Sequence, residues 1–249
     1  MQKTAALIEK HGDELAQLIT LENGKPLWEA RGEATAMATK VDLTLGEGAR
    51  FVADEILADL PGEIRHRPLG VVAVIGPFNF PGHLPNGHFV PALATGNTVV
   101  FKPSEKAPRT AALVARCFHE AGFPPGVFNV VQGDGTVASH LVTHAGVDGV
   151  LFTGSAAVGK RILAATAETP GKLVALELGG KNASLVFDDC SLERTVREIA
   201  FSGFATAGQR CTCTSRVIAT RGIAEQLAEK LAAAAKSIRV GYVFDEGVF

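Results

Sequence analysis

The chain has 249 residues, of which 47% are hydrophobic and 20% are charged, and its formal net charge is −2. This length and apolar content suffice for one large domain, or one and a half smaller ones, with a substantial buried core. The small negative charge provides no field that would hold a nucleic acid, and no apolar run is long enough to span a bilayer. The charged, amphipathic N-terminus is unlike a secretion signal, so we expect a cytoplasmic protein without a membrane or nucleic-acid partner.

The predicted elements begin with two long helices. Apolar side chains recur at helical spacing through the first twenty or so residues, and the sequence Asn-Gly-Lys-Pro at 23–26 ends that helix. A second helical stretch covers about 28–57, with interruptions at Gly46 and Gly48. Neither helix carries obvious chemistry, so we assign residues 1–60 to helices that pack on a following domain.

From Gly62 onward, short apolar runs rich in β-branched residues alternate with helical patterns. The runs lie at 71–75, 97–101, 127–131, 149–153, 173–178 and 183–187, and helices lie between them at about 108–121, 135–146 and 157–168. Nearly continuous apolar strands separated by helices predict a mostly parallel sheet that is covered on both faces. Right-handed crossovers then give a doubly wound, Rossmann-like α/β fold.

Ligands of a doubly wound sheet bind beyond the carboxyl ends of the strands, so the loops at those ends are the candidate site. The loop after 71–75 is rich in Pro and Gly over 76–88 and presents Asn79, whose side-chain amide could donate to a developing oxyanion. Asn79 is equally well explained as a turn residue. His83 and His88 are expected in the same loop.

Two further strand ends carry candidate contacts for a dinucleotide. Lys102 and Glu105 stand where an adenosine ribose would fall, and an acidic group there accepts from both ribose hydroxyls and repels a 2′-phosphate, which favours NAD over NADP. An ordinary solvated charge pair is the alternative, and it is the favoured explanation for Lys106. Gly154 and Ser155 open a helix whose free backbone N–H groups suit a pyrophosphate, although both are also ordinary helix-start residues. The common GxGxxG fingerprint is absent.

The strand at 173–178 and the helix break at Gly208 carry a candidate base and a candidate nucleophile. Glu177 ends a buried strand, so we expect a poorly hydrated carboxylate that can serve as a general base, although an ion pair with a nearby lysine explains Glu177 better if it is taken alone. Cys211 follows a helix break at Gly208, and the neighbouring Arg210 would favour its thiolate. Taken alone, Cys211 is better explained as an inert thiol.

The remaining cysteines carry no predicted chemistry. Cys117, Cys190 and Cys213 are expected to be inert thiols. A closed zinc site needs four well-placed ligands, and neither the Cys211–Cys213 pair nor the histidines of the 76–88 loop meet that requirement, so no metal is predicted.

Six ordered motifs together resemble the aldehyde dehydrogenase superfamily over nearly the whole chain. They are GPFNFP (76–81), GNTVVFKPSE (96–105), FTGS (152–155) with Gly159, LELGGKN (176–182), GQRC (208–211) and RVIAT (216–220). The combination of ELGGK with GQxC is highly specific. The resemblance implies an NAD-binding domain over 61–178, and over 179–249 the start of an α/β catalytic domain together with returning elements of the cofactor domain.

The resemblance also implies roles for individual residues. Cys211 matches the nucleophile, Glu177 matches the base that activates the deacylating water, and Asn79 with the Cys211 backbone N–H matches the oxyanion hole. The residues assigned to NAD are Lys102 and Glu105 at the adenosine ribose, Ser155 at the pyrophosphate, and Pro77, Phe78, Ser104, Gly154 and Gly159 elsewhere along the cofactor. Phe78 is a mild departure, since the family often has Trp there.

The implied reaction oxidises an aldehyde to a carboxylic acid through a thiohemiacetal and a thioester on Cys211, with hydride passing to NAD. Members that transfer the acyl group to coenzyme A or phosphate usually lack the base, so Glu177 favours release of a free acid.

Three stretches indicate the substrate class. Residues 22–30, 78–93 and 206–216 are most similar to family members that act on N-succinylglutamate 5-semialdehyde in bacterial arginine catabolism. Arg210 is a candidate partner for the charge of such an anionic aldehyde. Lys181 departs from that group, which often has Asn there.

Family members are much longer, so we expect a partial chain that lacks the start of the fold and most of the catalytic domain. Three interpretations stay open. They are a dehydrogenase, for this or another class of aldehyde, that is fully active only in the complete protein; a non-catalytic cofactor-binding remnant; and an esterase or thioesterase that uses Cys211 and Glu177 without hydride transfer. Residues 62–68 resemble the family's subunit-pairing strand, which implies a homo-oligomer.

Overall fold

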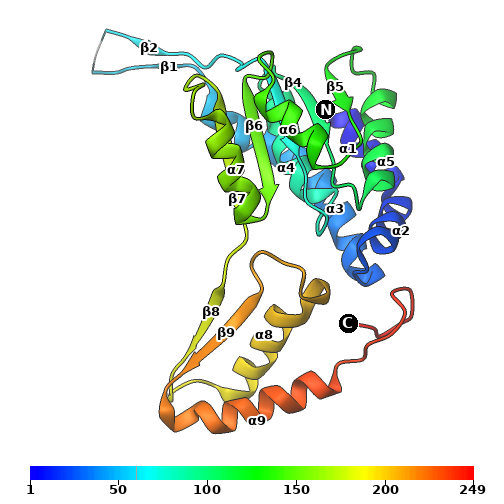
Figure 1. The fold of residues 1–249 in the computed structure, drawn as a ribbon, viewed down its shortest axis with the longest axis vertical. Helices are drawn as coiled ribbons and strands as arrows, with labels where there is room; N and C mark the ends of the chain where they lie inside the picture. Colours follow the sequence, from blue (N-terminus) through cyan, green and yellow to red (C-terminus); the bar gives the residue numbers. More distant parts are fainter. Residues whose placement is uncertain (60) are drawn as a thin grey trace.

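The computed structural model describes residues 1–59 and 61–249, and a five-stranded parallel sheet lies at its centre (Figure 1). The strands are β3 (Val71–Ile75), β4 (Thr98–Lys102), β5 (Phe128–Val130), β6 (Gly149–Gly154) and β7 (Leu173–Leu178). Their order across the sheet is β5-β4-β3-β6-β7, and each neighbouring pair is parallel. The predicted bounds of all five agree with the structure to within one residue, and the doubly wound α/β fold is confirmed.

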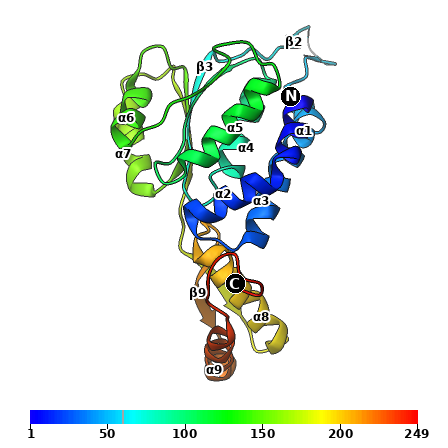
Figure 2. The same cartoon turned by 90° about the vertical axis from the view of Figure 1, so that its right-hand side faces the viewer.

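Helices cover both faces of this sheet, as Figure 2 shows edge-on. After β3 and β4 the chain crosses one face with α4 (His83–Ala94) and α5 (Pro108–Glu120), and after β5 and β6 it crosses the other face with α6 (Gly135–Thr143) and α7 (Ala156–Thr166). Because the chain winds outward from β3 in both directions, the loops after β3 and β6 part toward opposite faces. A crevice at the carboxyl edge of the sheet follows from that arrangement.

The two faces of the sheet carry separate hydrophobic cores. Val74 of β3 lies in the core beneath α4 and α5, and its neighbour Ile75 lies in the core beneath α6 and α7, as the period-two alternation of a strand requires. Aromatic rings dominate the first core: the rings of Phe118 and Phe128 stack with centroids 4.3 Å apart, and Phe89 contacts both. These cores fix the helices on which the site is built.

An outer layer of three helices covers α4 and α5: α1 (Gln2–Lys10), α2 (Gly12–Asn23) and α3 (Leu27–Leu45). The single helix predicted for the first twenty residues is wrong, because the helical hydrogen bonds break at His11, just before Gly12. Gly24, at a left-handed φ of 77°, ends α2 where the sequence predicts a stop.

The second predicted helix is too long. It ends at Gly46, beyond which the chain forms a short 3-10 helix (Gly48–Val52) and a two-stranded antiparallel hairpin of β1 (Glu55–Ile56) and β2 (Glu63–Ile64). The boundary predicted at residue 60 lies outside the described residues.

The histidines of the 76–88 segment lie on a helix, which corrects the expectation of a loop. α4 begins at His83, and Pro85 occupies its third position, where a backbone N–H has no partner within the helix and proline is tolerated. The helix start is capped from a distance: Oε1 of Glu33 on α3 accepts from the backbone N–H of Gly82 at 2.9 Å and of His83 at 3.0 Å. No local signal in 76–88 reveals that cap.

The sixth apolar run does not join the main sheet. β8 (Asn182–Val186) pairs in parallel with β9 (Thr214–Ala219) in a separate two-stranded sheet, which packs with α8 (Leu192–Phe204) and α9 (Arg221–Ser237). Figure 1 shows this unit beyond the tips of the main strands, so the carboxyl edge of the sheet faces it. The turn at 179–181 after β7 carries the chain away from the main sheet.

The last residues return to the N-terminal helices. The backbone N–H of Leu27 donates to the Val243 carbonyl at 3.1 Å, and Trp28 Nε1 donates to the Val248 carbonyl at 3.3 Å. Within residues 1–59 and 61–249, no helix is both long and apolar enough to cross a membrane.

Candidate active site

The predicted site residues gather at the carboxyl edge of the main sheet. Residues 76–82 follow β3, residues 103–107 follow β4, Ser155 follows β6 and residues 179–181 follow β7. These positions are far apart in sequence and become neighbours only because the strands are parallel and in register.

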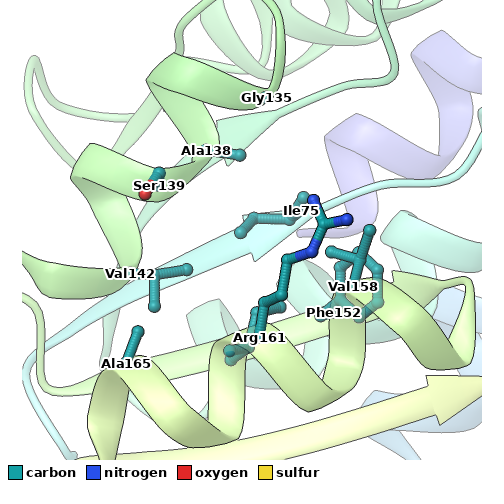
Figure 3. A pocket seen from close by; sticks show the side chains of 10 residues that line it. Ile75, Gly135, Ala138, Ser139, Val142, Phe152, Val158, Arg161 and Ala165 are labelled. Carbon is teal, nitrogen blue, oxygen red and sulfur yellow. The ribbon is translucent and has the colours of Figure 1, made fainter.

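A cavity of about 210 Å³ opens between α6 and α7 at this edge (Figure 3). Its lining is mostly apolar and consists of Ile75, Gly135, Ala138, Ser139, Val142, Phe152, Val158, Arg161, Ile162 and Ala165. In Figure 3 the side chains of α6 face those of α7 across the cavity, and Arg161 reaches across toward Ile75. The volume is below the roughly 300–1,000 Å³ of a pocket for a whole drug-sized ligand, so it suits one flat base of a larger molecule.

Sequence reasoning did not assign these α6 and α7 residues to the site. One local signal marks the start of α6: Asp134 is its N-cap, and Oδ1 accepts from the backbone N–H of Thr136 at 2.8 Å. The two helices face each other because both pack on the same face of the sheet, and no pattern in either helix alone predicts it.

A charged pair lies at the end of β4. Lys102 is 3% exposed and its Nζ lies 3.4 Å from Oε2 of the exposed Glu105. The backbone N–H of Glu105 itself and the Lys102 ammonium hold the pKa of Glu105 below its ordinary value, against the opposing effect of partial burial. Ser104 is buried, and its Oγ accepts from the backbone N–H of Lys106 at 3.3 Å. This corner therefore presents an ionised carboxylate to solvent.

The start of α7 combines a cap with close helix packing. Ser155 is the N-cap, and its Oγ accepts from the Val158 backbone N–H at 3.3 Å. Gly159 is buried against β7, where an added Cβ would lie 2.8 Å from Cδ2 of Leu178. Gly154 is similarly restricted by the ring of Phe152. The structure thus gives these residues packing and capping roles that are compatible with a ligand at the helix start.

The loop after β3 contacts the segment that carries the candidate nucleophile. Asn79 Nδ2 donates to the backbone carbonyl of Gln209 at 2.6 Å, two residues before Cys211. Pro77 is buried beneath this loop, while Phe78 is exposed and stacks with the Lys106 ammonium 5.0 Å from its ring centre. The pairing of Asn79 with the cysteine loop brings together two motifs that lie about 130 residues apart.

Cys211 is exposed on a loop with unusual backbone conformations. Thr206, Ala207 and Gly208 adopt left-handed φ values of 59°, 53° and 71°. For a residue with a Cβ this conformation costs about 1–2 kcal/mol, so surrounding contacts must impose it. Arg210 supplies one such contact, because its Nε donates to the Thr206 hydroxyl at 2.6 Å, and Asn182 Nδ2 separately holds the Cys211 carbonyl at 2.7 Å.

Glu177 is exposed, which corrects the expectation of a poorly hydrated carboxylate. β7 is an edge strand, so no neighbouring strand covers this side of the residue. Glu177 pairs in register with Thr153 of β6, whose hydroxyl lies 3.0 Å from Nε2 of His88. Burial lowers the pKa of His88, and the nearby Glu177 carboxylate opposes that effect. Sequence reasoning left His88 without a role, because only the fold places α4 over the β6–β7 end.

Arg210 is engaged with the protein rather than directed at solvent. Its guanidinium donates to Oε1 of Glu29 at 2.9 Å and to the hydroxyl of Thr206 at 2.6 Å. Glu29 is 4% exposed in its side chain, and its Oε2 is buried with no hydrogen-bond partner among the described residues. These contacts give Arg210 a structural explanation beside the predicted contact to substrate.

The other cysteines differ from Cys211 in their surroundings. Cys117 is buried in the core beneath α5, and burial raises its pKa to about 11, which removes its thiolate at neutral pH. All four cysteines are free thiols. In the part of the chain that the structure describes, no group of three or more His, Cys, Asp or Glu side chains is placed to hold a metal ion.

Comparisons with known proteins agree with this geometry. The sequence model described as "Aldehyde dehydrogenase family" matches residues 1–249. The chain is 45% identical, over 99% of its length and 51% of the relative's, to an N-succinylglutamate 5-semialdehyde dehydrogenase of Ectopseudomonas mendocina. It therefore spans about half the length of the curated relatives that it matches.

Two solved structures show the same fold. A γ-glutamyl-γ-aminobutyraldehyde dehydrogenase from Burkholderia cenocepacia superposes with a TM-score of 0.94 at 41% identity, covering 99% of this chain and 51% of that one. An NAD-dependent aldehyde dehydrogenase from Sinorhizobium meliloti also gives a TM-score of 0.94, at 37% identity, covering 100% of this chain and 50% of that one.

Proposed function

This chain belongs to the aldehyde dehydrogenase family, and we propose that it supplies the nucleophile, the oxyanion donor and the cofactor site for NAD-dependent oxidation of an aldehyde to a free carboxylic acid. The observation that carries the proposal is the hydrogen bond from Asn79 to the Gln209 carbonyl, which places an amide donor beside the loop of an exposed cysteine. A thiolate nucleophile beside an amide donor is the arrangement that addition to a carbonyl carbon requires.

The reaction proceeds in two stages on Cys211. The thiolate adds to the aldehyde carbon and forms a C–S bond, while the carbonyl electron pair moves to oxygen and gives an oxyanion that the second N–H of Asn79 stabilises. When bound, NAD accepts the hydride from that carbon, which leaves a thioester on Cys211. Glu177 then takes a proton from water, the resulting hydroxide attacks the thioester, and the C–S bond breaks to release the acid and the thiolate.

The residues at the carboxyl edge fit a dinucleotide. The apolar cavity between α6 and α7 has the size of one base, and the Lys102–Glu105 corner presents a carboxylate that accepts hydrogen bonds from ribose hydroxyls. That carboxylate would repel a 2′-phosphate, which supports NAD over NADP. Ser155 and the positive end of α7 suit the pyrophosphate.

The substrate that we propose is N-succinylglutamate 5-semialdehyde, as a step of bacterial arginine catabolism. The support is the name of the relatives that are 43–47% identical over nearly the whole chain. An aldehyde of another class is the competing proposal, since the similar B. cenocepacia structure is named for a different aldehyde.

We also propose that the protein assembles as a homo-oligomer through the segment 62–68. Ile56 and Ile64 of the β1–β2 hairpin are 84% and 43% exposed, and an exposed apolar strand edge favours pairing with a second copy. Sedimentation of the protein before and after an Ile64→Lys substitution tests this assignment.

The dehydrogenase proposal is tested by NADH absorbance with purified protein. We expect turnover of N-succinylglutamate 5-semialdehyde to exceed that of propanal, and we expect Cys211→Ser to abolish it while the matched control Cys190→Ser retains it. Faster turnover of propanal would refute the substrate assignment alone. Undiminished turnover by Cys211→Ser would refute the mechanism.

A further inference from the structure

Three amide side chains form a closed ring of hydrogen bonds between the α2–α3 turn and the two loops of the site. Asn23 Nδ2 donates to the carbonyl of Asn79 at 3.2 Å, Asn79 Nδ2 donates to the carbonyl of Gln209 at 2.6 Å, and Gln209 Nε2 donates to the carbonyl of Asn23 at 3.1 Å. Each member therefore holds the backbone of the next. We call these three residues the amide ring.

We propose that Asn23 is a positioning residue, which acts through the amide ring to hold the Asn79 amide toward the carbonyl that Cys211 attacks. The proposal rests on the oxyanion role proposed above for Asn79. Asn23 itself touches neither substrate nor nucleophile in this arrangement, because its donor atom is directed at the backbone carbonyls of Phe78 and Asn79.

The planarity of an amide makes this positioning effective. The Asn79 NH₂ group has two hydrogens, and the bond to Gln209 uses one of them. Because both hydrogens lie in the amide plane, fixing the first also fixes the direction of the second. Asn23 holds the backbone from which this side chain projects, so release of Asn23 frees the donor to move.

The turn that carries Asn23 is itself rigid. Asn23 Oδ1 accepts from the backbone N–H of Lys25 at 3.0 Å, and Gly24 between them has the left-handed φ that closes the turn. Lys25 is fully buried and pairs at 2.6 Å with Glu33, which caps the helix that follows the Asn79 loop. The turn and the loop thus share one buried anchor.

A second connection joins α3 to the nucleophile loop. Arg210 pairs with Glu29, so the loop of Cys211 is held by α3 even without the amide ring. Removal of the Asn23 side chain also leaves the bond from Gln209 intact, because that bond ends on the Asn23 backbone. Loss of the Asn23 donor therefore acts on the loop of Phe78 and Asn79, and the nucleophile keeps its place.

Two probes separate the oxyanion donor from the nucleophile. With p-nitrophenyl acetate, the Cys211 thiolate attacks the ester carbonyl through an oxyanion, a C–S bond forms, and the C–O bond breaks to release p-nitrophenolate. With iodoacetamide, the same thiolate displaces iodide at a saturated carbon, and no oxyanion forms. Both reactions proceed without cofactor or natural substrate, so they report on the site whatever aldehyde the protein uses.

The variants are Asn23→Ala, Asn23→Asp, Asn79→Ala and the double variant of Asn23→Ala with Asn79→Ala. Aspartate at 23 still accepts from the Lys25 N–H but cannot donate, so it preserves the turn, removes the donor and turns a carboxylate oxygen toward the carbonyls of Phe78 and Asn79. Asn129→Ala is the matched control, because the Asn129 amide also donates to two backbone carbonyls, those of Val99 and Gly126, away from the site.

We expect Asn79→Ala to slow the acylation by about 100-fold or more and either Asn23 variant to slow it by about 10- to 100-fold. The double variant should be no slower than Asn79→Ala alone, since Asn23 acts only through Asn79. Alkylation by iodoacetamide should be unchanged in every variant, and Asn129→Ala should be unchanged in both reactions.

Two results would overturn the positioning role: Asn23→Ala slows acylation as much in the Asn79→Ala background as in the wild type, or it slows alkylation as much as acylation. Normal acylation by both Asn23 variants beside a slow Asn79→Ala would also overturn it and leave the proposed function intact. If Asn79→Ala acylates normally, or if the wild type is not acylated at Cys211, the oxyanion assignment itself fails.

Discussion

Replacing Glu33 with alanine should destabilise the protein more than any exposed substitution, because it leaves Lys25 as a buried charge without a partner. Both side chains of this pair are 0% exposed, and Nζ lies 2.6 Å from Oε2. Glu33 also accepts from the backbone N–H groups of Gly82 and His83. The variant therefore loses an ion pair and the cap of α4 together.

The expected magnitude follows from these contacts. Breaking a buried ion pair by removing one partner costs about 3–5 kcal/mol. Two unpaired amides would add about 1–3 kcal/mol each if water could not reach them. Water entering the space left by the Glu33 side chain offsets part of that sum, so we expect a loss of about 5 kcal/mol. In a chain of this size, each kcal/mol of lost stability lowers Tm by about 2–4 °C, so the expected loss corresponds to a drop in Tm of about 10–20 °C.

The assay is urea denaturation followed by circular dichroism, with Glu47→Ala as the control. Glu47 pairs with Arg50 at 3.4 Å, but both side chains are more than 70% exposed, so its loss should cost about 0.5 kcal/mol or less. A surface substitution changes the free energy of unfolding by about 1 kcal/mol or less. If the free energy of unfolding of Glu33→Ala lies within about 1 kcal/mol of that of the control, the pair is not buried as the structure has it.

The deficit of Glu33→Ala should also depend on pH. Burial holds the pKa of Lys25 below its ordinary value of 10.5, while Glu33 opposes the effect, so the variant lowers that pKa further. The folded state then releases the proton of Lys25 at a lower pH than the unfolded state does. Stability of the variant therefore rises with pH between the two pKa values, and its deficit should shrink as the pH rises toward 10.5. A deficit that grows over this range would contradict the assignment.

Three further substitutions test the site. Ala138→Phe should fill the cavity between α6 and α7 and weaken NAD binding, measured by calorimetry, by about tenfold or more. Cys211 should stay reactive toward iodoacetamide in this variant, and unchanged NAD binding would exclude the cavity as the site of the base. Glu105→Gln should lower the preference for NAD over NADP by about tenfold in kcat/KM, because the repulsion of the 2′-phosphate is lost. Arg210→Ala should cost about 2 kcal/mol of stability by leaving Glu29 unpaired, whereas a raised KM for the anionic aldehyde at unchanged stability would favour the substrate role.

Much of the fold was predictable because it depends on local pattern. The strands of the main sheet are continuous apolar runs, so their bounds agree to within one residue, as Val71–Ile75 and Leu173–Leu178 do without any shift. Left-handed Gly24 ends α2 where the Asn-Gly-Lys-Pro turn predicts it. The division into three segments and the individual catalytic and cofactor roles stay predictions, because they came from resemblance and await the experiments above.

Two of the expectations that were wrong depended on which element lies next to which. The histidines of 76–88 were assigned to a loop because Pro85 and Gly87 are turn residues, but a carboxylate about 50 positions earlier caps a helix there. Glu177 was expected to be buried, and its exposure follows from the place of β7 at the edge of the sheet.

By itself, the sequence determined the strands, the doubly wound topology and the motifs that follow each strand, since apolar periodicity and turn residues act over a few positions. Only the tertiary structure decided that Asn79 contacts the cysteine loop, that Arg210 is paired with Glu29, and that α6 and α7 enclose a cavity. Those partners are about 20 to 180 residues apart. Their meeting depends on strand order and helix packing, which short-range patterns in the chain do not specify.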